Sequence, residues 1–341
     1  MKIGVLCPAE IAYRRFMPAL SKIDNFRFAG VGVYSKDERF GRMQFDDLIA
    51  SKAVAKANQK ADMFIQNYGG KIYKSYAELV SSKDIDSVYI PLPPALHYEW
   101  AKKALLAGKH VLLEKPFTTT RTETEELIQI AKSKKLAIHE NYMFVFHNQI
   151  KAIDDIVKSG KIGDIRIYRI NFGFPKRAEN DFRYDKKMGG GALLDAGGYT
   201  IKYASHLLGE NAHIAYAKLN YSDSIDVDLY GSGALINQEG TTVQVSFGMD
   251  NDYKCELEAW GSLGYLRANR VLTAPVDFTP QVVLQNANRQ NIIELPSDDA
   301  FKKSIEYFVE CINDCKVREK NYEDIRQQSI LMEEFRKKGD S

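Results

Sequence analysis

The most informative segment of this sequence is Gly189-Gly190-Gly191-Ala192-Leu193-Leu194-Asp195-Ala196-Gly197-Gly198-Tyr199, read together with Glu114-Lys115-Pro116 earlier in the chain. The glycine triplet allows a close backbone approach just before a helix. On that helix Asp195 and Tyr199, four residues apart, share one face. The residue before a proline is pushed out of helical geometry, so Lys115 is expected at the end of a strand. Both segments therefore predict ionisable groups held by an unusual backbone.

Together the two segments resemble the Gfo/Idh/MocA oxidoreductases. Two further matches are Met143-Phe144-Val145-Phe146-His147-Asn148-Gln149 and Pro91-Leu92-Pro93-Pro94, which is followed by His97. They extend the resemblance over nearly the whole chain. The resemblance implies an NAD(P)-dependent enzyme, and it leaves the substrate open.

Composition narrows the class of protein. The 341 residues suffice for two domains, and 47 Lys and Arg against 45 Asp and Glu give no field that favours nucleic acid or an anionic membrane. The start of the chain lacks the features of a signal peptide, and no apolar segment is long enough to span a bilayer. The four cysteines, at positions 7, 255, 311 and 315, complete no zinc-like spacing. We therefore expect a cytoplasmic protein with reduced thiols and no metal site.

The pattern of short apolar runs and helical segments predicts an α/β fold in two parts. Residues 1–118 alternate strands and helices, as in a doubly wound parallel Rossmann sheet, with a helix and a strand up to about residue 150 as a bridge. Residues 119–341 form an α+β domain on an open, mostly antiparallel sheet. The strands expected in the first part are Ile3–Leu6, Phe28–Tyr34, Ser87–Ile90 and Val111–Leu113. The open sheet could serve as the interface of a homodimer or homotetramer.

The dinucleotide loop departs from the family pattern. A pyrophosphate binds at the N-terminus of the first helix, where family members usually carry Gly-x-Gly-x-x-Ala. This chain has Leu6-Cys7-Pro8-Ala9-Glu10-Ile11-Ala12. The small residues keep the loop narrow, so we expect altered or weakened binding rather than none, with Glu10 pointing away from the phosphates. The expected cofactor-binding residues are Cys7, Pro8, Ala9, Glu10, Ile11, Ser35, Lys36, Arg39, Pro91, Leu92, His97, Glu114 and Lys115.

The end of the second strand favours NADP(H) over NAD(H). An acid at this point binds the ribose hydroxyls of NAD and repels the 2'-phosphate of NADP. Here Ser35 and Lys36 replace the acid and Arg39 lies close by, although Asp37 and Glu38 add opposing charge. The alternative is an ordinary solvated turn.

The resemblance also implies the catalytic residues, which are Lys115, Tyr199 and Asp195. Hydride delivery to a ketone leaves an alkoxide that must be stabilised or protonated. We assign Tyr199 as the proton donor and Lys115 as the orienting group, and the two roles could be exchanged. Asp195 would bind a substrate hydroxyl or hold the lysine. The structural alternatives are a helix-start carboxylate for Asp195 and a core aromatic for Tyr199.

Substrate specificity is expected from residues 174–185, which combine aromatic rings with cations just before the glycine triplet. Lys176, Arg177 and Arg183 could bind a sugar phosphate or a nucleotide diphosphate, with Tyr184 beside them. The alternative is a charged surface loop. His147, like His97, occupies a substrate-pocket position in the family, although a lone histidine is more often a packing residue.

Three functions compete. The first is NADPH-dependent reduction of a keto group on a nucleotide-linked deoxysugar, because residues 181–195 resemble the dTDP-sugar 3-ketoreductases of the family. The second is oxidation of a free sugar such as xylose, or of a dihydrodiol. The third is a regulatory protein that binds the cofactor without turnover, which the intact Lys115, Asp195 and Tyr199 disfavour.

Overall fold

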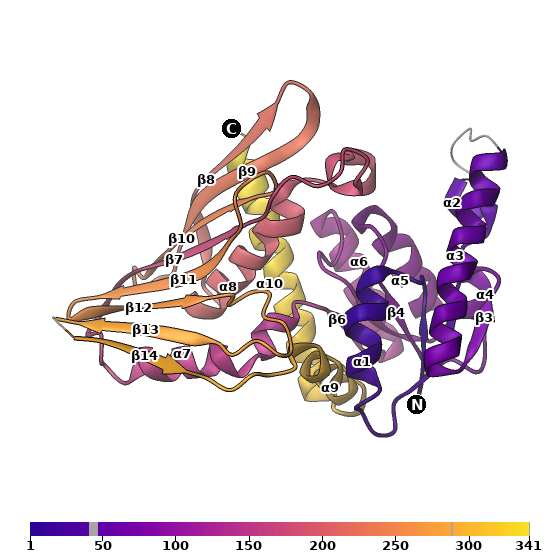
Figure 1. The fold of residues 1–341 in the computed structure, drawn as a ribbon, viewed down its shortest axis with the longest axis horizontal. Helices are drawn as coiled ribbons and strands as arrows, with labels where there is room; N and C mark the ends of the chain where they lie inside the picture. Colours follow the sequence, from indigo (N-terminus) through magenta and orange to yellow (C-terminus); the bar gives the residue numbers. More distant parts are fainter. Residues whose placement is uncertain (41–46, 288, 341) are drawn as a thin grey trace. The chain divides into compact units, whose positions relative to one another are not determined.

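The computed structural model describes residues 1–40, 47–287 and 289–340, with 39, 40 and 47–50 described as backbone only (Figure 1). The chain divides into two compact units. The first unit comprises Met1–Thr118, Thr122–Asn141 and Ser304–Glu323. The second comprises Thr119–Arg121, Tyr142–Lys303 and the residues from Asp324 on.

The first unit contains a parallel six-stranded sheet in the order β3-β2-β1-β4-β5-β6. Its strands are β1 (Lys2–Val5), β2 (Arg27–Gly32), β3 (Lys71–Tyr73), β4 (Ser87–Ile90), β5 (His110–Leu113) and β6 (Ile138–Glu140). The order reverses direction between β1 and β4, so this is the topological switch point at which doubly wound sheets bind ligands. The Rossmann architecture predicted from the sequence is confirmed, whereas the short strand β3 was not predicted.

Helices connect the strands of the first unit. They are α1 (Met17–Leu20), which continues a π-helical turn (Ala12–Phe16), α2 (Lys36–Phe40), α3 (Asp47–Tyr68), α4 (Tyr76–Ser81), α5 (His97–Leu106) and α6 (Arg121–Lys134). Helices α3 and α4 pack beside β2 and β3 (Figure 1). The ring of Phe16 stacks on Tyr89 with 3.9 Å between centroids, which fixes the first helix against β4.

Part of the C-terminal helical region also belongs to the first unit, although the sequence predicted this region as part of the second domain, 119–341. Helix α9 spans Ala300–Asn313 and α10 spans Cys315–Gly339, and the division between units runs through both. Tyr322 donates to the carbonyl of Leu136, and Lys132 pairs with Glu319 and Glu323. An amphipathic pattern reveals that a helix has a buried face but not which core covers it.

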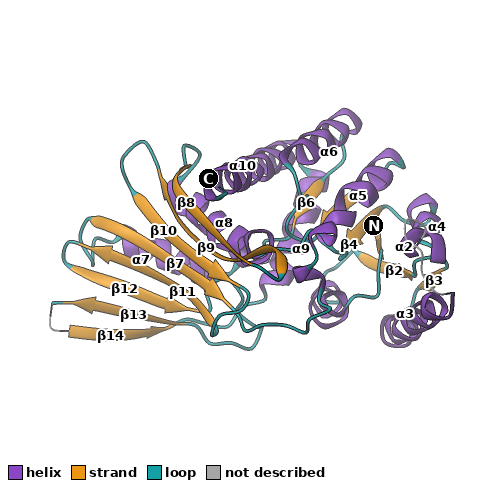
Figure 2. Ribbon diagram, turned by 90° about the horizontal axis from the view of Figure 1, so that it is seen from above, coloured by secondary structure: helices purple, strands orange, loops and turns teal. Residues whose placement is uncertain are grey.

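The second unit is built on an eight-stranded sheet in the order β14-β13-β12-β11-β7-β10-β9-β8. Only β7 and β10 pair in parallel among these neighbours, so the predicted mostly antiparallel sheet is confirmed. Figure 2 shows α7 (Asn148–Lys158) and α8 (Gly198–Leu208) behind this sheet. The strands are β7 (Ile165–Gly173), β8 (His213–Ser222), β9 (Ile225–Ile236), β10 (Thr242–Gly248), β11 (Lys254–Gly261), β12 (Gly264–Asn269), β13 (Gln281–Asn286) and β14 (Arg289–Glu294).

Buried and more exposed side chains alternate along most of β9 and along β11, as a sheet with one open face requires. Tyr230 of β9 and Trp260 of β11 are about half exposed. Among the helices in the described part of the chain, none is long and apolar enough to cross a membrane.

Candidate active site

The loop after β1 lies at the switch point of the first unit. Ala9 donates its amide to Cys7 O at 2.7 Å, and the first helical bond runs from Tyr13 N to Ala9 O at 3.0 Å. The amides of the first helical turn have no carbonyl within the helix to bind, and this leaves them for a ligand. Glu10 is exposed and pairs with Arg14 at 3.6 Å, so its charge is partly offset. The narrow loop therefore fits a pyrophosphate without a glycine.

The turn after β2 is a capping box. Ser35 N donates to Glu38 Oε2 at 2.8 Å, and Glu38 N donates to Ser35 Oγ at 3.2 Å. The Glu38 carboxylate also accepts from the amides of Tyr76 and Ala77, at 3.0 and 2.9 Å, at the start of α4. Three backbone donors thus share the opposing charge of Glu38, and Lys36 remains exposed at the same turn. The Arg39 side chain, expected to assist, lies outside the described part of the structure.

Glu114 and Lys115 follow β5 directly, and the Lys115–Pro116 peptide is cis. Tyr89 donates from its hydroxyl to Glu114 Oε1 at 2.6 Å, and Asn141 donates from Nδ2 to the same oxygen at 2.7 Å. Burial raises the pKa of Glu114, while these two donors and the charge of Lys115 oppose that shift. Glu114, the residue before Lys115, is therefore held in place by Tyr89 of β4 and by Asn141, which directly follows β6.

His97, at the start of α5, is fully buried and contacts the segment around Pro116. Its Nδ1 lies 2.8 Å from Pro116 O and its Nε2 lies 2.7 Å from Leu92 O. Burial lowers the pKa of His97 to about 4, so the ring is neutral at pH 7 and donates to one of these carbonyls. His97 therefore clamps the backbone around Pro116 and joins it to the Pro91-Leu92 turn. Its expected contact with the cofactor stays a prediction.

In the second unit, Arg183 binds two carboxylates. Its Nε donates to Asp195 Oδ2 at 2.5 Å, and its Nη1 lies 3.1 Å from Asp181 Oδ1. Burial alone would lower the pKa of Arg183, but the carboxylates, Asp195 most strongly, raise it. This guanidinium pairs with Asp195 and sets its orientation, and its expected contact with a phosphate stays a prediction.

The glycine triplet makes two close approaches. A Cβ on Gly190 would lie 2.4 Å from Arg183 O, and a Cβ on Gly191 would lie 2.4 Å from Asp228 Oδ1, where φ is also +118°. Asp228 of β9 accepts the amide of Leu193 at 2.6 Å. Leu193 begins a π-helical turn (Leu193–Gly197), which replaces the start of the predicted α-helix and carries Asp195. Asp228 is therefore a long-range cap for the segment that bears Asp195.

Tyr199, at the start of α8, is 8% exposed and surrounded by aromatic rings. The centroids of Tyr142, Phe172 and Phe144 lie 5.2, 5.3 and 5.8 Å from its own. Edge-to-face packing of this kind restrains a ring strongly. The aromatic cage accounts for a core tyrosine and equally provides the rigid placement that a proton donor needs.

The remaining substrate-binding candidates also belong to the second unit. His147 is buried and accepts the Gln149 amide at Nδ1, and its Nε2 has no hydrogen-bond partner among the described residues. Burial lowers the pKa of His147, so Nε2 carries the proton of a neutral ring. Tyr184 receives the amide of Arg177 and donates to the carbonyl of Met249. Lys176 and Arg177 are exposed, with the guanidinium of Arg177 5.3 Å from the Phe174 ring centroid.

Comparison with known proteins decides the family. Residues 25–142 match the sequence model described as "Oxidoreductase family, NAD-binding Rossmann fold", and residues 150–267 match the "GFO/IDH/MocA C-terminal domain". The chain belongs to the Gfo/Idh/MocA oxidoreductases. One relative within this family, the dTDP-3,4-didehydro-2,6-dideoxy-alpha-D-glucose 3-reductase of Actinomadura kijaniata, is 35% identical over 333 residues, or 97% of this chain and 93% of the relative.

Two further likenesses bear on the substrate of this Gfo/Idh/MocA enzyme. The crystal structure of a 3-ketoreductase from Actinomadura kijaniata in complex with NADP and TDP-benzene matches with a TM-score of 0.89 at 34% identity, covering 99% of this chain and 97% of that one. The D-xylose 1-dehydrogenase (NADP(+)) 2 of Haloferax volcanii is 27% identical over 316 residues, or 92% of this chain and 89% of the relative.

The structure divides the candidate residues of this Gfo/Idh/MocA chain into two sets. The expected cofactor residues and Lys115 lie in the first unit, and Asp195, Tyr199, His147 and residues 174–185 lie in the second. Sequence reasoning missed four residues that hold these sets in place, namely Tyr89, Asn141, Asp181 and Asp228. Only Asp181 carried a local signal, since it lies two residues before Arg183.

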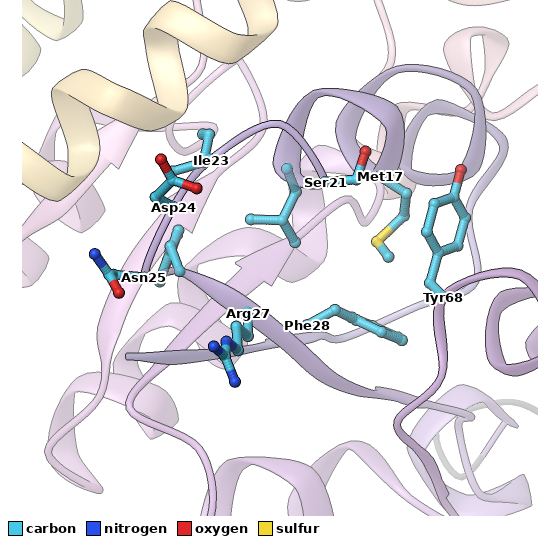
Figure 3. A pocket seen from close by; sticks show the side chains of 10 residues that line it. Met17, Ser21, Ile23, Asp24, Asn25, Arg27, Phe28 and Tyr68 are labelled. Atoms are coloured by element: carbon cyan, nitrogen blue, oxygen red, sulfur yellow. The ribbon is translucent and has the colours of Figure 1, made fainter.

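The first unit also has a surface hollow of about 620 Å³ near the start of β2 (Figure 3). Met17, Asp24, Arg27 and Tyr68 are among its lining residues, and none of the candidate site residues is. Because β1 and β2 are parallel, this hollow lies at the amino ends of the strands, opposite the switch-point loops. Doubly wound sheets bind their ligands at the carboxyl ends, so the hollow is not the cofactor site.

Proposed function

We propose that this enzyme uses NADPH to reduce a keto group of a nucleotide-linked deoxysugar. The observation that carries the proposal is the likeness, over nearly the full length of both chains, to a 3-ketoreductase solved with NADP and TDP-benzene. The 3-reductase of a dTDP-linked dideoxyglucose, at 35% identity, supports the same substrate class. The carbon that reacts would be position 3 of the sugar ring, as in those relatives.

The residues of the first unit fit a nicotinamide dinucleotide. The helix start after Ala9 offers backbone amides to a pyrophosphate. The capping box at Ser35 uses the Glu38 carboxylate internally and keeps Lys36 at the strand end, which suits a 2'-phosphate. NADPH, when bound, supplies the hydride for the ketone.

The chain's own side chains would then handle the charge and the proton. Lys115 is fixed next to Glu114 and donates to the substrate oxygen, where negative charge develops. Tyr199 supplies the proton from its hydroxyl, with its ring restrained by Tyr142 and Phe172. Asp195, paired with Arg183, accepts a hydroxyl of the sugar.

The nucleotide diphosphate would be bound by the exposed cations Lys176 and Arg177 rather than by Arg183. The guanidinium of Arg183 is engaged by Asp181 and Asp195, so a phosphate would have to compete with two carboxylates. Arg177 lies against the face of Phe174, and that ring could also receive a base by stacking.

A second candidate function is NADP-dependent oxidation of a free sugar, and the 27% identical xylose dehydrogenase supports it. The cations of residues 174–187 favour the nucleotide-linked substrate, because a free sugar carries no charge for them to bind. We further propose that the protein is cytoplasmic, as its four free cysteines suggest. A homodimer or homotetramer formed through the open sheet face would cover Tyr230 and Trp260.

Titration with NADPH and NADH, followed by nicotinamide fluorescence, tests this function. We expect NADPH to bind in the micromolar range with NADH much weaker, and dTDP to enhance binding. Turnover of a dTDP-linked 3-keto sugar without turnover of D-xylose would support the reductase. Turnover of D-xylose without turnover of the keto sugar would favour the sugar dehydrogenase instead. Failure to bind either cofactor would argue against both enzymatic functions.

A further inference from the structure

A buried chain of polar side chains leads to Glu114 from the helices that complete the first unit. His139 of β6 has its Nδ1 3.0 Å from Asn321 Oδ1 and its Nε2 3.0 Å from Ser304 Oγ. The Ser304 hydroxyl lies 2.8 Å from Asn141 Oδ1, and Asn141 Nδ2 donates to Glu114 Oε1 at 2.7 Å. His139, Asn141, Ser304 and Asn321 are each at most 3% exposed, so water does not replace these bonds.

With Glu114 ionised, the two amides fix the direction of every hydrogen bond in this chain. Asn321 donates from Nδ2 to the carbonyl of Ile138, so its Oδ1 faces His139 and can only accept. Asn141 likewise uses Nδ2 on Glu114, so its Oδ1 can only accept from Ser304. A serine hydroxyl carries a single hydrogen. Because Ser304 donates that hydrogen to Asn141, it must accept from His139.

With Glu114 ionised, both ring nitrogens of His139 therefore face acceptors, and this favours a proton on each. A neutral ring would leave one nitrogen lone pair 3.0 Å from an oxygen lone pair in a buried site, which is costly. Turning the Asn141 amide would relieve the clash only if Glu114 were protonated, since the amide oxygen would then face the carboxyl. In either arrangement the chain holds one proton more than a neutral histidine and an ionised glutamate would.

The surroundings of His139 are compatible with a cation. The Tyr307 and Phe308 rings of α9 lie 5.4 and 6.4 Å from the imidazole centroid, and the Tyr307 distance is within the range of about 6 Å for cation–π contacts. The neighbouring carboxylate on β6, Glu140, accepts the amide of Phe117. His97 also has acceptors at both ring nitrogens, the carbonyls of Pro116 and Leu92. Its ring is nevertheless neutral, because its hydrogen bonds lead to no carboxylate that would balance a buried charge.

We infer that His139 is a positioning residue, held as an imidazolium whose charge is balanced through Ser304 and Asn141 by ionised Glu114, which in turn fixes Lys115. This inference rests on the proposed function for the role of Lys115, but not for the state of His139. The balanced pair keeps the carboxylate next to Lys115 charged in a buried setting, where an unpaired charge would be lost. Ser304 of α9 and Asn321 of α10 thereby contribute hydrogen bonds that support Glu114 and Lys115 of the first unit.

Nitrogen NMR on protein labelled at its six histidines tests the charge directly and without substrate. We expect both ring nitrogens of His139 to carry protons at pH 7.5, with the signal assigned by its absence in His139→Gln. A spectrum with one bare ring nitrogen would overturn the inference, whether or not the enzyme proves to be a ketoreductase.

A matched pair of serine variants tests the positioning role. Ser304→Ala breaks the chain, while Ser87→Ala removes an equally buried hydroxyl of the first unit that bonds weakly to Lys2 O at 3.4 Å. We expect Ser304→Ala to lose one His139 ring proton and to lower kcat about tenfold, with the Kd for NADPH changed less than about twofold. Ser87→Ala should match the wild type. Equal kcat in Ser304→Ala and wild type, with NADPH bound normally, would refute the positioning role and leave the proposed function standing.

Discussion

Arg183 donates from Nε to Asp195 Oδ2 at 2.5 Å, and the same guanidinium reaches Asp181 at 3.1 Å. The Arg183–Asp195 pair joins the loop that precedes the glycine triplet to the helix that follows the triplet. A cation that looked suited to a phosphate is thus committed to carboxylates. The basic loop therefore contains both positioning and ligand-binding cations, and they should be separable by mutation.

Replacing Arg183 with lysine should lower kcat more than it raises KM. The ammonium keeps the charge but cannot reproduce the fork that holds both carboxylates, so Asp195 would lose its orientation. We expect a loss of about tenfold or more in kcat with a dTDP-linked 3-keto sugar. Arg177→Lys and Arg177→Ala are the controls, since Arg177 is exposed and should affect KM. A large rise in KM at unchanged kcat for Arg183→Lys would make Arg183 a phosphate ligand instead.

Replacing Lys115 with alanine should reduce turnover by orders of magnitude while the fold stays intact. The reason is the loss of the cation that faces the developing alkoxide. Circular dichroism and NADPH binding would check the fold, and Lys109→Ala would be unsuitable as a control because that lysine binds two backbone carbonyls. Lys103→Ala, an exposed change on α5, is better matched. Unchanged kinetics in Lys115→Ala would remove this residue from the mechanism.

The sequence predicted what depends on local backbone and missed what depends on distant partners. Pro116 and the glycine triplet mark unusual backbone wherever they occur, and this was enough to locate Lys115 and Asp195. Asp228 lies 35 residues beyond the amide that it caps, and Asn141 lies 27 residues from Glu114. No periodicity in the sequence connects such positions, because only the sheet order brings them together.

The histidines also show that a sequence pattern does not reveal distant hydrogen-bond partners. The position of His97 suggested a ligand, and the structure shows a buried ring that clamps Pro116 and Leu92. His139 carried no signal in an apolar strand, yet it lies at the centre of a polar chain. A short strand predicts that alternate side chains are buried but not which polar groups they meet.

Replacing Ser35 with aspartate should weaken NADPH binding more than NADH binding. Aspartate is as good a cap as serine, so the turn with Glu38 should persist and the change should act through charge. Repulsion of the 2'-phosphate then separates the two cofactors. Fluorescence titration gives both Kd values, with Ser224→Asp as the control, since it adds the same charge to an exposed turn of the second unit. Equal effects on both cofactors would show that this turn does not recognise the 2'-phosphate.

Asp228 should make stability depend on pH in a direction opposite to that of a typical carboxylate. Burial raises its pKa from 3.8 to about 6, although the amide of Leu193 opposes the shift. A carboxyl whose folded pKa is raised stabilises the fold fully below its unfolded pKa, and that contribution is lost as pH rises through about 6. The loss amounts to about 3 kcal/mol of unfolding free energy for a shift of this size.

Asp228→Asn isolates this effect, because an amide oxygen can still accept from Leu193 while no proton is gained or lost. Denaturant unfolding of both proteins between pH 4 and 7.5 gives the difference in free energy, and the other titrating groups cancel. We expect the variant to gain stability relative to the wild type as pH rises from 4 to 6 and to stay level above that range. A difference that does not change with pH would mean that Asp228 keeps an ordinary pKa, with the Leu193 amide and nearby cations offsetting its burial completely.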